Sequence, residues 1–265
     1  ENLSEKIMRE ARVVGATLTR IYLIPQKIGK FENLIIDEAS TPSLPLVHFA
    51  SSMAEKRVII SGDFRQLPPI PKTKNKIIAN IIFRNVFLYS KHKPPIADLF
   101  KGDQNHKNAH MLKWQYRMPN EVCDLLSQFS YNSQLKTAPN SKKSNHAVPD
   151  GFEGSITVLD TSEIMPFCDV NSSGSRYNVM HALIAERVTQ KFVSNGGKGT
   201  IGYCSPFRAQ SDLVDSIFYK SGLKHDVTAA TIHVYQGDEK DIIIFDTVDG
   251  LGGAKTAGSQ ISKDN

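Results

Sequence analysis

Short apolar runs bounded by turn-forming residues are the most regular pattern in the first 110 positions of the chain. The runs are ARVVGATL (11–18), NLIIDEAS (33–40) and RVIISGD (57–63). Runs of this length, rich in Ile and Val, are typical of strands buried in a parallel sheet. Between the last two runs, positions 43–56 carry apolar side chains at roughly helical spacing. The alternation predicts part of an α/β domain over about residues 1–110.

The same rhythm resumes after a stretch rich in Pro, Asn, Ser, Lys and Gly at 139–154, which predicts a loop. A helix is also expected to begin near Pro119. The later elements are predicted as a strand at 155–160, a helix at 178–197 ending at a glycine pair, a strand at 200–206, a helix at 209–219, and strands at about 227–233 and 241–248. The chain is therefore expected to be an α/β protein with domains at 1–112 and 113–265.

Composition narrows the class of protein only slightly. The 265 residues are 40% hydrophobic and 22% charged, with a formal net charge of +5, which suits a polyanionic partner but is common without one. Cys123, Cys168 and Cys204 stand far apart and are expected to be buried thiols rather than zinc ligands or disulfides. The chain has neither an apolar run of about 20 residues nor a signal-like start, so a soluble cytoplasmic protein is expected.

Two adjacent carboxylates follow the second apolar run. Asp37 and Glu38 come directly after residues 34–36, at the end of a predicted buried strand. Open α/β sheets place ligands at this end of their strands. An aspartate in this Walker B arrangement can hold Mg²⁺ on a nucleotide, and a glutamate beside it can activate the attacking water. The alternative is that one of the two carboxylates caps the following helix.

The string SGDFRQLPP at 61–69 begins at the end of the next predicted strand. Its Gln66 amide stands on a short loop that ends in Pro68 and Pro69, and prolines stiffen a loop. A fixed amide suits the sensing of a γ-phosphate. The alternative is an ordinary Gly-Asp turn with a rigid exit.

An arginine stands between aromatic residues and a predicted helix in the string WQYRMP at 114–119. The planar guanidinium of Arg117 matches phosphate oxygens, and Tyr116 could stack on a base. The alternative is a packed surface or an ion pair.

The string TIHVYQGDEKD at 231–241 leads straight into an apolar strand. Gly237 permits close backbone approach, while Gln236, Glu239 and Asp241 gather polar groups in one loop. The alternative is a charged hairpin-like loop.

The four strings in this order resemble one family, the superfamily 1 helicases related to the nonsense-mediated-decay helicase. The resemblance runs from about Ala11 to Val248, and GDFRQLPP, QYRMP and HVYQGDEKD are its most specific strings. It implies the P-loop NTPase fold, with two RecA-like parallel-sheet domains, ATP and Mg²⁺ bound between them, and single-stranded nucleic acid running across both.

The resemblance also implies roles for individual residues. Asp37 would bind Mg²⁺, Glu38 would activate water, and Gln66 would couple the γ-phosphate to the nucleic acid. Arg117 would serve as an arginine finger and Tyr116 would lie against the adenine. The remaining implied contacts are Gln236, Gly237 and Glu239 for the nucleotide, and Thr17, Thr19, Pro68, Arg208, Thr231 and His233 for the nucleic acid.

Two family motifs are missing from the sequence. No GxxxxGK[ST] phosphate loop occurs, and no arginine-bearing final motif appears before Asn265. Because the phosphate loop cradles the β- and γ-phosphates, these 265 residues alone are expected to hydrolyse ATP poorly, as a fragment whose first domain is incomplete at its N-terminus. The expected parent is a 5′-to-3′ DNA helicase. The alternatives are an RNA helicase of the same family and a catalytically silent nucleic-acid-binding or assembly module.

Overall fold

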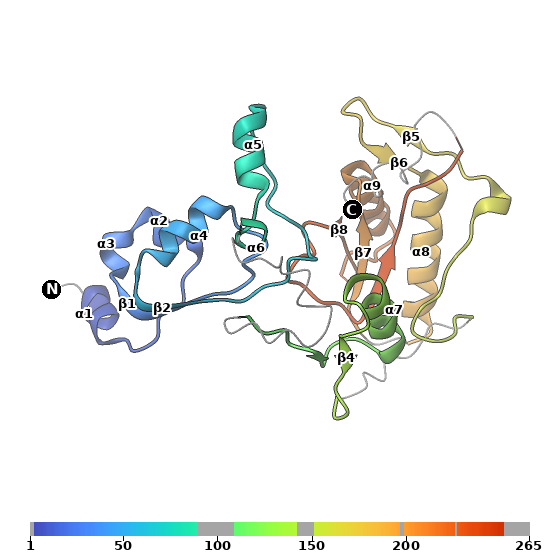
Figure 1. Cartoon of the computed structure of the whole chain (residues 1–265). Coiled ribbons are helices and arrows are strands. Elements are labelled where there is room, and N and C mark those ends of the chain that lie inside the picture. Colours follow the sequence, from blue (N-terminus) through green and yellow to red (C-terminus); the bar gives the residue numbers. More distant parts are fainter. Residues whose placement is uncertain (1–2, 90–108, 142–150, 197–198, 226, 252–265) are drawn as a thin grey trace. The chain divides into compact units, whose positions relative to one another are not determined.

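The computed structural model describes residues 3–89, 109–141, 151–196, 199–225 and 227–251. The chain divides into two compact units. The first unit comprises Glu1–Met111 and Ser130–Asn132, and the second comprises Leu112–Phe129 and Ser133–Asn265. Most of the first unit is blue to teal in Figure 1, and the second runs from green to red.

The first unit is built around a small parallel sheet. Its two strands pair in parallel, with Ile36 opposite Ile60, and the core beneath them contains the buried side chains of Ile36, Val47 and Ala50. The predicted strands at 33–40 and 57–63 and the helix between them are confirmed. The elements are α1 (Leu3–Glu10), α2 (Leu18–Leu23), α3 (Pro25–Ile28), β1 (Phe31–Ile36), α4 (Leu44–Ser51), β2 (Ala54–Ile60), α5 (Lys76–Phe83) and α6 (Val86–Tyr89).

The first apolar run, residues 11–18, is not the strand that its composition predicts. Thr17 has extended backbone angles, and its hydroxyl accepts a hydrogen bond from Arg20 N at 3.2 Å, which makes it the N-cap of α2. Val13 is 90% exposed. An apolar run becomes a strand only where a neighbouring strand takes its backbone hydrogen bonds, and among the described residues β1 and β2 pair with each other alone.

The second unit contains a three-stranded parallel sheet in the order β8-β7-β9, with Ser205 opposite Thr231 and Cys204 opposite Phe245. Two smaller pairs accompany it, β3 with β4 in parallel and β5 with β6 in antiparallel. The elements are β3 (Trp114–Gln115), α7 (Asn120–Ser130), β4 (Lys136–Thr137), a 3₁₀ turn at Ser162–Ile164, β5 (Asp169–Val170), β6 (Arg176–Tyr177), α8 (Val179–Ser194), β7 (Ile201–Ser205), α9 (Arg208–Lys220), β8 (Val227–Thr231) and β9 (Ile242–Phe245).

The core of the second unit lies where α8 and α9 pack against the sheet (Figure 1). Every residue of the central strand β7 is buried. Tyr203 of β7 meets Phe218 of α9 edge to face, with ring centroids 6.4 Å apart, a favourable geometry for aromatic pairs. The predicted α7, α8, α9, β7, β8 and β9 are confirmed. Helix α8 ends where Gly196 adopts a φ of 72°, as its glycine pair predicted.

The predicted strand at 155–160 is wrong. These residues form no strand, and Val158 and Leu159 are 84% and 50% exposed. A side chain contact joins the start of the segment to α7, where Ser155 Oγ donates to Glu121 Oε2 at 2.6 Å. Alternating apolar residues suit a strand, but pairing requires a partner that the described part of the chain does not offer here.

The structure is thus a mixed α/β protein with small parallel sheets, consistent with the P-loop NTPase fold. The three cysteines are buried free thiols, as expected, and burial raises the pKa of Cys204 to about 11. Within the described ranges, no helix combines the length and apolar character needed to cross a bilayer.

Candidate functional site

The end of β1 presents two carboxylates on a tight turn. Asp37 Oδ1 accepts hydrogen bonds from Glu38 N at 3.0 Å and from Ser61 Oγ at 2.9 Å. Glu38 has a φ of 52°, a left-handed conformation that costs energy for a residue with a Cβ. The N-cap of α4 is Ser43. The two carboxylates therefore do not cap that helix, and both stay exposed at the end of the sheet.

The loop that follows β2 is joined to this turn by backbone contacts. Ser61 N donates to Ile36 O at 2.8 Å, and Ala39 N donates to Ser61 O at 2.9 Å. A Cβ on Gly62 would lie 2.8 Å from Ala39 N, so the approach requires glycine at this position. The GDFRQLPP loop is held against the Asp-Glu turn by the backbone.

The oxygen atoms at this turn suit Mg²⁺. Both contacts of Asp37 fall on Oδ1, so among the described residues Oδ2 is left for a ligand. No group of three or more His, Cys, Asp or Glu side chains with metal-binding geometry occurs in the described ranges. Mg²⁺ does not need one, since it usually keeps several waters and binds one or two carboxylates plus substrate phosphates. Asp37, with Ser61 beside it, could hold Mg²⁺ on a bound nucleotide.

Gln66 is held through Asp63, a residue whose role is not visible in the sequence. Gln66 N donates to Asp63 O at 3.0 Å, and Gln66 Nε2 donates to Asp63 Oδ2 at 3.3 Å. Asp63 also accepts hydrogen bonds from Arg65 N at 2.9 Å and from the Tyr131 hydroxyl at 2.5 Å. Burial and the Asp63 carboxylate raise the pKa of Tyr131, which therefore stays a donor at neutral pH. The position of the Gln66 amide thus depends on one aspartate, and the half-buried Pro68 follows it.

Arg117 and Glu239 meet in the second unit. Arg117 Nε lies 2.5 Å from Glu239 Oε2, and the two side chains are 69% and 67% exposed. Tyr116 is 68% exposed beside them. The structure therefore brings together two of the predicted nucleotide-site residues from separate loops. An exposed ion pair adds little to stability, so both groups are available to a ligand.

Short contacts shape the loop that carries Glu239. Gly237 has a φ of 82°, and Glu239 N donates to Asp238 Oδ1 at 2.9 Å, while Gln236 is half-buried. Asp241 Oδ2 accepts from Thr200 N at 2.6 Å and from Thr200 Oγ1 at 3.0 Å, which ties the end of the loop to the residue before β7.

Three of the predicted nucleic-acid residues lie at the same end of the second unit's sheet. Arg208 begins α9 just after β7, while Thr231 ends β8 and His233 follows it. Ile232 N donates to Ser205 O at 3.2 Å, which holds the two strand ends together. The Arg208 side chain is 85% exposed and pairs with Asp212 at 3.5 Å.

The other predicted nucleic-acid residues belong to the first unit. Thr17 is the N-cap of α2, Thr19 is exposed on that helix, and Pro68 is half-buried in the GDFRQLPP loop.

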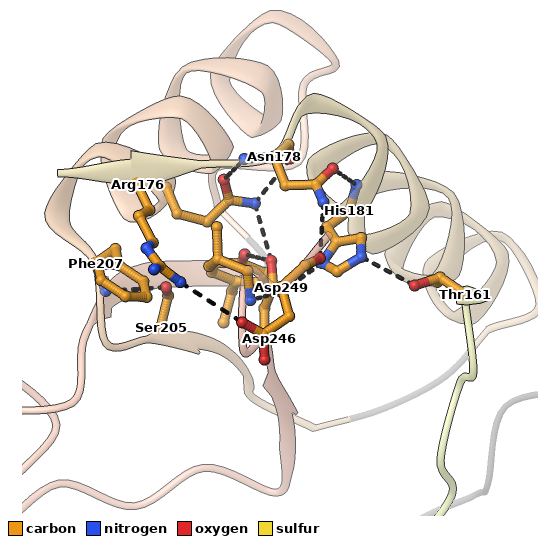
Figure 2. A network of polar contacts seen from close by, with 11 residues as sticks. Thr161, Arg176, Asn178, His181, Ser205, Phe207, Asp246 and Asp249 are labelled. Carbon is orange, nitrogen blue, oxygen red and sulfur yellow. Dashed lines mark hydrogen bonds and ion pairs between the residues drawn. The ribbon is translucent and has the colours of Figure 1, made fainter. Parts of the chain in front are cut away.

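A buried polar network that the sequence does not reveal lies behind the end of β9 (Figure 2). Asp246, only 8% exposed, accepts four hydrogen bonds. Its Oδ1 accepts from His181 Nδ1 at 2.7 Å and from Val248 N at 2.8 Å. Its Oδ2 accepts from Gln210 Nε2 at 2.9 Å and from the Tyr203 hydroxyl. Both carboxylate oxygens are saturated by the protein itself.

The network extends to the first turn of α8. Gln210 Oε1 accepts from Asn178 N at 2.7 Å, and Asn178 Nδ2 donates to Asp249 O at 3.1 Å. Arg176 pairs with Asp249 at 3.7 Å and stacks on the Phe207 ring, as Figure 2 shows. Gln210 stands in the string SPFRAQ, whose sequence alone does not reveal its partners, because Asn178 and Asp246 lie 32 and 36 positions away.

Comparisons with known proteins agree with this geometry. Family models described as an AAA domain match residues 97–259 and 1–74. Regulator of nonsense transcripts 1 of Dictyostelium discoideum is 27% identical over 256 residues, which are 91% of this chain and 18% of that protein. The DNA replication ATP-dependent helicase/nuclease dna2 of Schizosaccharomyces pombe is 28% identical over 262 residues, 90% of this chain and 18% of that protein.

A third relative is the DNA polymerase alpha-associated DNA helicase A of Saccharomyces cerevisiae, 27% identical over 251 residues, 87% of this chain and 35% of that protein. The chain thus spans between 18% and 35% of the length of these three relatives. One AAA-domain model alone covers more than half of the chain. Together with the motif residues at the ends of β1 and β2 and before β9, these matches show that the chain belongs to the superfamily 1 helicase family.

Proposed function

We propose that this chain is the motor segment of an ATP-dependent helicase or translocase that moves 5′ to 3′ along single-stranded DNA. The observation that carries the proposal is the turn after β1, where the exposed Asp37 and Glu38 are held against the GDFRQLPP loop by backbone bonds. A metal-binding carboxylate, a second carboxylate for water and a fixed amide are the parts that phosphoryl transfer to water requires.

The two units contribute different parts of this chemistry in the proposal, each as part of a RecA-like domain, with 1–112 and 113–265 as the two segments. In the first, Asp37 binds Mg²⁺, Glu38 activates water and Gln66 senses the γ-phosphate. In the second, Arg117 neutralises phosphate charge and Tyr116 lies against the adenine, while Gln236, Gly237 and Glu239 line the nucleotide site. The exposed Arg117 and Glu239 pair supports this assignment, since a buried pair could not exchange partners with a ligand.

Single-stranded nucleic acid is the proposed track. The clustering of Arg208, Thr231 and His233 at the ends of β7 and β8 supports backbone contacts there, because an exposed guanidinium and a hydroxyl suit phosphate oxygens. Thr17, Thr19 and Pro68 are the proposed contacts in the first unit.

DNA is favoured over RNA because two of the three relatives described above are named as DNA enzymes. RNA is the second candidate, favoured by the relative named as a regulator of nonsense transcripts. Base stacking and phosphate contacts serve either polymer, so the track has to be measured.

The test is ATP hydrolysis by the full-length protein that contains this chain, with single-stranded DNA, single-stranded RNA or neither. Glu38→Gln is the test variant. Its matched control is Glu32→Gln, an exposed carboxylate on β1 that pairs with Lys56 and lies outside the proposed site. Strong stimulation by one polymer, lost in Glu38→Gln and kept in Glu32→Gln, is the expected result and identifies the track.

Unwinding of duplexes with a single 5′ or 3′ tail then reports polarity, and 5′ tails are expected to be required. Stimulation by RNA alone would replace DNA with RNA as the track. If the full-length protein binds nucleic acid but shows no stimulated turnover, the motor proposal is wrong and the silent binding module takes its place.

A further inference from the structure

Gln115, the last residue of β3, uses every hydrogen-bonding position of its side-chain amide. Its Oε1 accepts from Arg117 N at 2.8 Å and from Met118 N at 2.7 Å. Its Nε2 donates to Met118 O at 2.8 Å and to Thr137 Oγ1 at 2.7 Å. A primary amide has two donors and one oxygen with two lone pairs, so the side chain is saturated.

Three of these four bonds go to the backbone of the two residues that follow Tyr116. They bind both polar groups of Met118 and the N–H of Arg117, and so they fix the turn between β3 and α7 from the inside. The fourth bond anchors the amide to Thr137 of β4, which lies directly opposite Gln115 in the parallel pair. The half-buried amide thus connects the turn to a neighbouring strand.

The side chains on this turn have the opposite environment. Tyr116 is 68% exposed, and the Arg117 side chain is 69% exposed, with its guanidinium paired to the exposed Glu239. A long exposed side chain explores many rotamers, so the backbone at Arg117 sets only the region from which the guanidinium can reach a ligand. Among the described contacts, Gln115 is the side chain that holds that backbone.

We propose that Gln115 is a positioning residue that orients Arg117 toward the phosphates of the bound nucleotide. The inference rests on the proposed function, in which Arg117 neutralises phosphate charge. Because all four hydrogen-bonding positions of its amide are used within the protein, Gln115 acts by fixing the conformation of the turn rather than by binding the nucleotide or the metal. A displacement of about 1 Å at a group that acts on the transition state can lower the rate about 100-fold, which makes such positioning measurable.

The requirement is specific to glutamine. In Gln115→Glu, the carboxylate still accepts from Arg117 N and Met118 N and can accept from the Thr137 hydroxyl, but it has no donor for Met118 O. Gln115→Ala removes all four bonds. Thr137→Val removes only the anchor to β4.

The experiment compares steady-state ATP hydrolysis by the full-length protein carrying Gln115→Ala, Gln115→Glu, Thr137→Val, Arg117→Ala or the pair Gln115→Ala with Arg117→Ala. The matched control is Gln190→Ala, a half-buried glutamine on α8 whose amide donates to Glu186 Oε1 at 3.2 Å. Thermal unfolding of every variant is measured in parallel.

For a positioning residue, kcat should fall about 10-fold to 100-fold in Gln115→Ala and less in Gln115→Glu and Thr137→Val, while KM for ATP stays within about 3-fold. Adding Gln115→Ala to Arg117→Ala should lower kcat no further, because the effect of Gln115 passes through Arg117. Gln190→Ala should keep its kcat.

The outcomes separate the two proposals. Full turnover by Arg117→Ala would overturn the proposed role of Arg117. A large loss in Arg117→Ala with unchanged kcat in the folded Gln115→Glu and Thr137→Val variants would overturn the positioning role alone. So would additive losses in the double variant, since they would mean that Gln115 acts independently of Arg117. If Gln115→Ala does not fold, Gln115→Glu and Thr137→Val decide the question.

Discussion

Two aspartates that follow apolar strands in nearly the same sequence context have opposite environments in the folded protein. Asp37 follows Ile36 at the end of β1, and Asp246 follows Phe245 at the end of β9. Asp37 is exposed, and both of its hydrogen bonds to described residues fall on Oδ1. Asp246 is buried and accepts two hydrogen bonds on each oxygen.

The difference separates a carboxylate that can take a ligand from one that holds the fold together. A metal ion needs free lone pairs. The lone pairs of the Asp246 carboxylate already accept hydrogen bonds from His181, Tyr203, Gln210 and the Val248 N–H. Burial by itself raises the pKa of Asp246, but the hydrogen bonds from His181, Tyr203 and Val248 outweigh it, and the pKa lies below its ordinary value. Asp246 is thus an ionised structural group in the second unit, while Asp37 remains open to Mg²⁺.

The largest expected effect is the loss of ATP turnover in Asp37→Asn. The asparagine oxygen can still accept from Glu38 N and Ser61 Oγ, so the fold should be kept, while the charge that would hold Mg²⁺ is gone. Turnover should fall at least about 100-fold, because metal binding contributes several kcal/mol to such a transition state. Steady-state ATP hydrolysis by the full-length protein, measured across a Mg²⁺ titration, reports the loss. An unchanged rate with unchanged Mg²⁺ dependence would show that Asp37 is not the metal ligand.

Asp246→Asn should lower the stability of the fold, in contrast to Asp37→Asn, which should lower ATP turnover and keep the fold. Its amide places a donor where Tyr203 or His181 now donates, which leaves buried groups unsatisfied. The free energy of unfolding should fall by about 2–3 kcal/mol. Urea unfolding measures it, with Asp212→Asn, an exposed carboxylate on α9, as the control that should stay at the wild-type value. Wild-type stability in Asp246→Asn would mean that the network contributes nothing.

The smallest expected effect is a change in how the free energy of unfolding falls at acid pH. Because the folded pKa of Asp246 is lowered from its ordinary value of 3.8, its contribution is fully present above that pH and is lost as the pH falls through the folded pKa. The gap in unfolding free energy between wild type and Asp246→Asn should therefore shrink as the pH falls below about 4. Urea unfolding from neutral pH downward measures it. A gap that stays constant or widens in acid would contradict the assignment of Asp246 as the ionised partner.

The sequence predicted those elements whose pattern is local. The strands β1, β2, β7, β8 and β9 were visible as apolar runs, and α8 was visible from its periodicity and its glycine stop. Two other runs of similar character, at 11–18 and 155–160, failed. A strand exists only through its neighbour, and neither run carries information about whether a neighbour is present.

The residues proposed for the candidate site belong to continuous strings of the sequence. They are Asp37, Glu38, Gln66, Arg117 and Glu239. The side chains that hold them in place do not stand out in the sequence. Gln115 lay inside one of those strings without a role, and Asp63 had no role although its carboxylate fixes Gln66.

By itself, then, the sequence determined the family and the α/β class, and it suggested candidate residues for phosphate chemistry, because each depends on the order of side chains over a few positions. Only the tertiary structure decided which polar groups stay open to a ligand and which are fully engaged in hydrogen bonds within the protein. Asp37 and Asp246 look alike in the sequence, and their difference arises from Tyr203, Gln210 and His181, which lie 36 to 65 positions from Asp246 along the chain. Burial and hydrogen bonding depend on packing in three dimensions, which local pattern does not encode.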